Sequence, residues 1–203
     1  MPIQKITTGV IDSIANTQIS GTITASQIAT VNANTITSGS IPLAQIPQLT
    51  GVKMPTGSVL QVVSVNKVNA FTTTSSSPVD VTGLSVNITP SSASSKILVL
   101  AQIYGGSDVS TGFYVNLVRN STNLNIGTAG SGVGNSTAGS YFASGSYWST
   151  SPIIFLDSPA TTSSTTYKIQ LFNSGSGTLA VNRRADDAVV GGSSTITVLE
   201  IAA

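Results

Sequence analysis

The sequence offers carboxylates, but no histidine and no cysteine, for acid–base or nucleophilic chemistry. Neither a Ser-His nor a Cys-His pair can therefore be built. Glycoside hydrolysis needs two carboxylates that flank one bond, and the acids are Asp12, Asp80, Asp108, Asp157, Asp186, Asp187 and Glu200. On a strand, the adjacent Asp186 and Asp187 would face opposite ways. We expect no enzyme and no catalytic residue.

Metal and cofactor sites are also not expected. Transition metals lack their usual nitrogen and sulfur ligands here. For calcium, only Asp108, Asp186 and Asp187 with neighbouring carbonyls suggest themselves. No phosphate-binding loop or dinucleotide fingerprint occurs. A cation on the axis of a trimer is the alternative that stays open.

One aromatic cluster interrupts an aromatic-poor chain. The segment SYFASGSYW (140–148) contains Tyr141, Phe142, Tyr147 and Trp148. If it forms one strand, alternation places Tyr141 and Tyr147 on one face, with Phe142 and Trp148 on the other. Outward-facing aromatics bind sugars or protein partners. We nevertheless favour a core or subunit-interface role for this segment over a ligand site.

The densest charge cluster is NRRADD (182–187), with Arg183, Arg184, Asp186 and Asp187. We interpret it as a surface or intersubunit set of salt bridges in preference to a receptor-recognition site. Together with Tyr141, Tyr147 and Trp148, these residues are the candidate interface or ligand surface.

Charge is scarce in the chain as a whole. Charged residues make up 7% of it and the formal net charge is +1, whereas about 25% is typical. Nothing indicates binding to nucleic acid or to an anionic membrane. The start, MPIQKITTGV, has no apolar signal region, and runs such as KILVLAQI are too short to span a bilayer. We expect a product made in a cytoplasm, without membrane insertion.

The second part of the chain predicts an all-β domain, because short β-prone runs alternate with Ser/Gly/Thr-rich turns. The predicted strands cover 58–65, 79–88, 96–104, 113–119, 140–148, 152–157, 166–173, 178–183 and 194–202. With no helical stretch between them, they favour an antiparallel sandwich, most simply a jelly roll.

The first part is different, because isoleucines recur every four or five residues. The motif Ile-x-x-x-Gln-Ile begins at Ile14, Ile23 and Ile41. At about 100° per residue these positions do not form a helical stripe, and one extended chain buries too little to pay for its own ordering. Three copies around an axis could stack apolar layers, as in a trimeric fibre shaft; a disordered leader is the alternative. The predicted shaft core is Ile14, Ile19, Ile23, Ile28, Ile36, Ile41 and Ile46.

We therefore predict an anchor and extended shaft over 1–50, a linker over 51–57 and a jelly-roll head over 58–203. The phrases GSVLQVVSV, VDVTGLSVNITPSSASSKILVLAQI, FLDSPATTSSTTYKIQLFNSGSGTLAVN and STITVLEIA resemble the carboxy-terminal heads of tailed-bacteriophage fibres and appendages. ITTGVIDS and the Ile/Gln repeat resemble their shafts. The resemblance implies a trimeric head similar to the tumour-necrosis-factor jelly roll.

The predicted function is that of a non-enzymatic structural protein of a tailed-phage virion. We expect a homotrimeric capsid decoration (cement) protein or short head fibre, anchored by its N-terminal arm to a major capsid protein or tail component. The alternative is a receptor-binding tail-fibre tip that recognises a host-surface glycan or protein. A secreted cellular ligand of the tumour-necrosis-factor type is disfavoured, because no secretion signal is seen.

Overall fold

The computed structural model describes residues 54–128, 135–143, 147–187 and 189–203. By its internal contacts the chain divides into two units, Met1–Pro47 and Gln48–Ala203. All seven isoleucines of the predicted shaft core lie outside the described residues. The account below therefore concerns the second unit.

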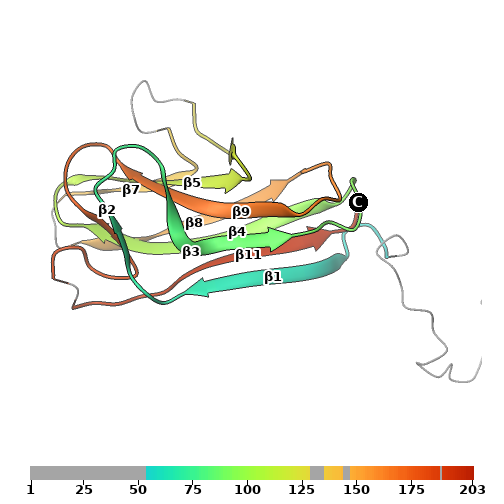
Figure 1. Ribbon diagram of the computed structural model, residues 1–203, viewed down its shortest axis with the longest axis horizontal. Coiled ribbons are helices and arrows are strands. Elements are labelled where there is room, and N and C mark those ends of the chain that lie inside the picture. The colour runs from blue at the N-terminus through green and yellow to red at the C-terminus, as the bar shows by residue number, and fades with distance from the viewer. Residues whose placement is uncertain (1–53, 129–134, 144–146, 188) are drawn as a thin grey trace, which may run out of the picture. The chain divides into compact units, whose positions relative to one another are not determined.

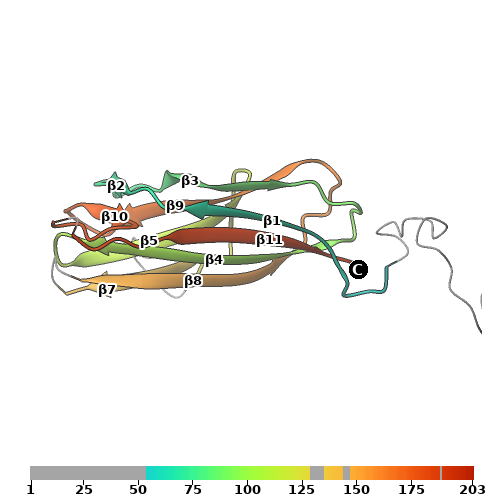
Figure 2. The ribbon, with the colours of Figure 1, turned by 90° about the horizontal axis from the view of Figure 1, so that it is seen from below.

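The described residues form eleven strands in two antiparallel sheets (Figures 1 and 2). Sheet A contains β1 (Val59–Lys67), β2 (Phe71–Thr73), β4 (Lys96–Ser107), β8 (Trp148–Asp157), β10 (Leu179–Val181) and β11 (Ser194–Ile201). Sheet B contains β3 (Val79–Ile88), β5 (Thr111–Arg119), β6 (Thr122–Leu124), β7 (Ala138–Phe142) and β9 (Thr165–Asn173). The predicted all-β sandwich is confirmed.

The strand order is that of a jelly roll. When the three-residue strands β2, β6 and β10 are set aside, sheet A runs β1-β11-β4-β8 and sheet B runs β3-β9-β5-β7. The first strand thus pairs with the last and the second with the last but one, as two interleaved Greek keys require. β10 pairs with the same edge of β4 as β11, further along the strand. β2 in turn pairs with β10, beyond the end of β1.

Alternation along the strands builds the core. In β4, Ile97, Val99 and Ile103 point inward and are fully buried, and β9 supplies Ile169 and Leu171 from the facing sheet. Successive side chains of a strand point to opposite faces, so this inward set fixes which residues point outward. The same alternation therefore determines the chemistry of the two outer faces.

Most strand predictions hold, and the differences have local causes. β3 has the predicted bounds, and the other long strands shift by a few residues. The predicted strand 140–148 is wrong: β7 ends at Phe142 and β8 begins at Trp148, with small residues between them. The three-residue strands β2 and β6 were not predicted, because alternation cannot be read from so few residues.

Candidate functional site

The two clusters singled out in the sequence meet at one end of the sandwich. A hollow of about 290 Å³ opens between β7, at the edge of sheet B, and β8, at the edge of sheet A. Its lining is Ser140, Tyr141, Phe142, Ala143, Tyr147, Trp148 and Ser149. β8 begins at the end of the sandwich opposite the C-terminus (Figure 1).

Three rings of this hollow are open to solvent. Tyr141 is 71% exposed, Tyr147 58% and Trp148 42%, whereas Phe142 is 4% exposed. Phe142 packs edge-on against Phe113, with ring centroids 5.9 Å apart. The predicted sharing of a face by Phe142 and Trp148 is therefore wrong, because the chain does not continue as one strand between them. In this chain the three rings do not belong to the core.

A glycine allows the close approach of the aromatic segment to β4. Gly106 pairs with Trp148 in the β4–β8 ladder. A Cβ atom at Gly106 would lie 2.5 Å from the Tyr147 carbonyl oxygen, closer than real Cβ contacts come. The absent side chain therefore sets where the two exposed rings at the start of β8 stand.

Arg184 joins the charged cluster to the aromatic one. Its guanidinium carbon lies 6.0 Å from the ring centroid of Trp148, within cation–π range. Arg184 Nε donates to Asp187 Oδ1 at 2.7 Å and lies 3.1 Å from Asp186 Oδ1, and Nη2 pairs with Asp187 Oδ2. Two carboxylates therefore hold the cation beside the indole. Asp186 and Asp187 lie on a turn, not a strand, so both reach Arg184, contrary to the expectation of opposite faces.

The loop that carries Arg184 is fixed by Asn182, a residue that was not predicted to matter. Asn182 is buried with φ at +65°, a conformation that asparagine tolerates better than most residues. Its Nδ2 donates to the carbonyls of Lys67 and Asn69, and its Oδ1 accepts from Ser194 at 2.6 Å. Arg183 is half-buried, and its backbone forms an isolated antiparallel β-bridge with Gly191.

Two buried carboxylates of the described residues, Asp157 and Glu200, serve the fold. Asp157 accepts from Arg119 Nη1 at 2.8 Å and from the Tyr167 hydroxyl at 2.6 Å. Burial and the hydrogen bond to Asp157 raise the pKa of Tyr167 far above its ordinary value. The Tyr167 hydroxyl therefore stays protonated and keeps donating its hydrogen bond to Asp157. In the described residues no group of three or more potential acidic ligands could hold a metal ion.

Glu200 is a second buried and well-partnered acid. Gln61 Nε2 donates to it at 2.6 Å, and the Ser91 amide and hydroxyl each donate at 2.7 Å. Burial alone would raise the pKa of Glu200, but these hydrogen bonds and one from Ser95 outweigh it and lower the pKa below its ordinary value. This carboxylate ties β11 to β1 and to the turn before β4.

An aliphatic patch lies on the outer face of sheet A. The cross-strand register places Val62, Leu199, Leu98 and Leu156 in one row across four strands, and Leu100 and Ile154 in the next. Ile154 is 75% exposed. Between these rows and Trp148, the outward positions of β4, β8 and β11 are Gln, Thr, Pro and Tyr. On the other side of the rows, Lys96 points outward and donates to the Ser158 hydroxyl. A shallow depression of about 270 Å³ lies over Leu100, Pro152 and Ile154.

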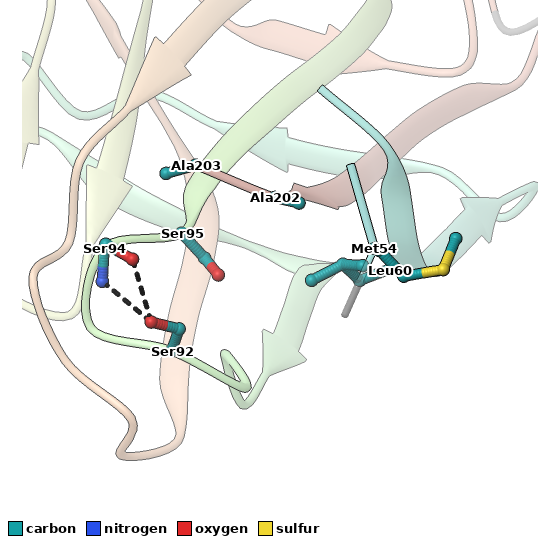
Figure 3. A pocket seen from close by; sticks show the side chains of 7 residues that line it. All are labelled: Met54, Leu60, Ser92, Ser94, Ser95, Ala202 and Ala203. Atoms are coloured by element: carbon teal, nitrogen blue, oxygen red, sulfur yellow. Dashed lines mark hydrogen bonds between the residues drawn. The ribbon is translucent and has the colours of Figure 1, made fainter. Parts of the chain in front are cut away.

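A smaller cavity of about 110 Å³ lies at the other end, where the chain enters the head (Figure 3). Its lining is Met54, Leu60, Ser92, Ser94, Ser95, Ala202 and Ala203. The hydroxyls of Ser92 and Ser94 lie 2.9 Å apart and pair with each other. Ser95 is a hydrogen-bond partner of Glu200. The polar groups of this cavity are thus already used within the fold.

Within the part of the chain that the structure describes, no helix is long and apolar enough to cross a bilayer.

Comparisons with known proteins give only distant similarity. No protein-family model matches the chain, and no curated protein sequence does. A structure of infectious bursal disease virus, Gx strain, is 15% identical over 70% of this chain and 42% of its own, with a TM-score of 0.37. Eiger TNF from S. frugiperda is 12% identical over 70% of this chain and 93% of its own, with a TM-score of 0.37. The VP2 subviral particle of infectious bursal disease virus is 17% identical over 70% and 38%, with a TM-score of 0.30.

This chain therefore spans less than half the length of the bursal disease virus chains it matches. The similarities concern the fold and assign no function. The jelly-roll assignment itself rests on the strand order described above.

Proposed function

We propose that this protein is a non-enzymatic structural component of a tailed-phage virion that works as a homotrimer. The observation that carries the proposal is the outer face of sheet A, where aliphatic side chains from β1, β11, β4 and β8 form adjoining rows. Contiguous exposed apolar surface of this kind is uncommon on monomers and marks interaction sites. An aliphatic patch of this kind suits association between copies of the same chain.

The number of copies is inferred from the leader. Its isoleucines recur too sparsely for one chain to bury them, and three chains around an axis complete each layer. Closed cyclic symmetry then lets the same head surface be used in every subunit. The shaft and the outer face of sheet A would thus stabilise one assembly together.

The proposed role is that of a capsid decoration protein or short head fibre, attached through residues 1–50 to a neighbouring virion protein. The resemblance of the head and leader phrases to phage appendages supports this location. Fifty extended residues reach at most roughly 165 Å at about 3.3 Å per residue, which suits a short attachment and not a long adsorption fibre. The work is mechanical: buried subunit surface would clamp the site to which the trimer binds.

Light scattering on the purified full chain tests the assembly, and a monomer at every concentration would refute it. Gold-labelled protein on intact particles tests the location. We expect label on the shell, whereas label only at the tail would exclude decoration. Removal of residues 1–50 should leave a folded head that no longer joins particles, and retained attachment would refute the anchor.

A receptor-binding tip is the second candidate, because one observation favours it. The aromatic hollow lies at the far end of β4 from the point where the chain enters the head. Ile97 pairs with Asp157 near the entry and Gly106 with Trp148 near the hollow, which separates the two ends by roughly 30 Å at about 3.3 Å per residue. Tail-only label would favour this candidate.

A further inference from the structure

We propose that the hollow formed by Tyr141, Tyr147 and Trp148, with Arg184 beside it, is a binding site for a neutral saccharide. The inference goes beyond the structural role proposed above and does not depend on it. It rests on ring exposure, on the polar groups around the rings and on the local charge.

The rings provide a platform that the fold does not need. Tyr141, Tyr147 and Trp148 stay exposed although the core is close, since Phe142 between them in sequence is buried against Phe113. A pyranose presents an apolar C–H face that stacks on such rings, and its hydroxyl groups project from the rim of the ring. Tyr and Trp suit such a ligand, because their rings are apolar and their hydroxyl or indole N–H group can form hydrogen bonds at the ring edge.

Hydrogen-bonding groups stand at the margin of the platform. The Tyr141 hydroxyl lies 3.2 Å from the Ser110 hydroxyl, and the serines at 140 and 149 line the hollow. The guanidinium of Arg184 lies over Trp148 and is held by Asp186 and Asp187. Donors and acceptors therefore occur together, as sugar hydroxyls, which act as both, require.

The charge favours a neutral sugar over an acidic one. The cluster beside the rings has two arginines and two aspartates, so its formal charges cancel. Arg184 already pairs with Asp187 through Nε and Nη2 and with Asp186 through Nε. An anionic sugar would have to displace these carboxylates or approach them without compensation.

The size argues against a protein partner. The hollow measures about 290 Å³, and three partly covered rings present a few hundred Å² at most, since each offers about 150–250 Å² when fully buried. A stable protein–protein interface buries about 800 Å² on each partner. One or two sugar rings match the platform, whereas a protein would have to rely on surface beyond it.

Trp148 makes the test direct, because it is the single tryptophan of the chain. The full-length protein is titrated with maltose, cellobiose, lactose and N,N′-diacetylchitobiose, with sialyllactose as the acidic comparison, while tryptophan emission is recorded. We expect a saturable change with at least one neutral sugar. Saturation-transfer NMR on the same mixtures gives a readout that does not use the indole.

Three variants locate the site. Y141A and Y147A should each weaken binding about tenfold or more, as loss of a central aromatic contact does. V68A changes an exposed residue in the turn after β1, outside both the hollow and the apolar rows, and should bind like the parent protein. Thermal melting confirms that each variant is folded. For a variant that is not, chemical-shift changes in the parent protein, confined to residues around the hollow, take its place.

The outcomes are decisive in both directions. Saturable neutral-sugar binding that depends on Tyr141 and Tyr147 but not on Val68 supports the proposal. Binding of sialyllactose alone would overturn the neutral assignment, and binding that survives both tyrosine variants would overturn the location. No emission change and no saturation transfer with any of the sugars at tens of millimolar would overturn the site. Each of these results leaves the proposed virion role to its own tests.

Discussion

Replacing Ile154 with serine tests the proposed subunit interface most sharply, because this side chain is the most exposed aliphatic on the outer face of sheet A. Ile154 is 75% exposed, and complete burial of an isoleucine contributes about 2–3 kcal/mol. Burying the exposed part therefore contributes about 2 kcal/mol per subunit and about 6 kcal/mol for three subunits. I154S should lose most of this free energy of association.

The assay is sedimentation velocity over a wide range of protein concentrations. Dissociation of a trimer into three monomers depends on the square of the concentration, and each 1.4 kcal/mol is a factor of ten in the equilibrium constant. A loss of about 6 kcal/mol therefore raises the midpoint concentration about a hundredfold. V68S is the matched control, since Val68 is 69% exposed but lies in the turn after β1, outside the apolar rows.

Two results would refute the reasoning. A parent protein that stays monomeric at all concentrations removes the assembly altogether. An oligomer whose midpoint is the same in I154S as in V68S shows that the subunits meet elsewhere. The thermal stability of the two variants in dilute solution should be alike, because neither side chain contributes to the core of this chain.

The remaining predictions concern the fold that carries these surfaces. G106A should shift the emission of the single tryptophan and abolish binding at the hollow, because the added Cβ collides with the backbone entering β8. Removing the guanidinium in R119M leaves the buried Asp157 carboxylate short of a partner and should lower the free energy of unfolding by about 3 kcal/mol in urea titrations. K168M, at an exposed ion pair, should cost less than about 1 kcal/mol. Because the folded-state pKa of Glu200 is lowered, its contribution is present above the ordinary pKa and is lost as pH falls through the folded value. E200Q should flatten the loss of stability as the pH falls below the ordinary pKa of glutamate, and an unchanged slope would contradict the assignment.

The sequence was sufficient to predict the class of fold, because alternation is a local property. β3 was predicted with its bounds from VDVTGLSVNI alone, and the long strands around it follow the same rule. The segment 140–148 failed because the rule was applied across ASGS, a run of small turn-forming residues that could have indicated a break. The strand order could not be read from such patterns, since it depends on pairings between distant segments.

The candidate site shows the same division. Both clusters were recognised from composition, but their meeting was not, because Arg184 and Trp148 are far apart in the sequence and come together through β4 and the loop fixed by Asn182. The buried role of Asp157 was likewise invisible, because its partners come from two other strands. Among the described acids, Asp157 and Glu200 stabilise the fold through buried hydrogen bonds.

The proposed interface and the proposed sugar site share one strand, which raises a question that Trp148 itself can answer. Ile154 and Trp148 point to the same side of β8, but six residues separate them, roughly 20 Å at about 3.3 Å per residue. The apolar rows end before that point, and the outward positions between them and Trp148 are Thr150 and Pro152. A subunit contact limited to the rows would leave the indole open.

We therefore expect the emission maximum of Trp148 and its quenching by acrylamide to be the same in the oligomer and in dilute I154S monomer. A blue shift and protection from acrylamide on assembly would place the indole in the subunit contact. The interface interpretation of the aromatic cluster would then hold, and the hollow would be closed to sugars in the assembled protein. If I154S loses assembly while the emission of Trp148 stays the same, the two surfaces are separate. The subunit contact would then involve the aliphatic rows but not the indole.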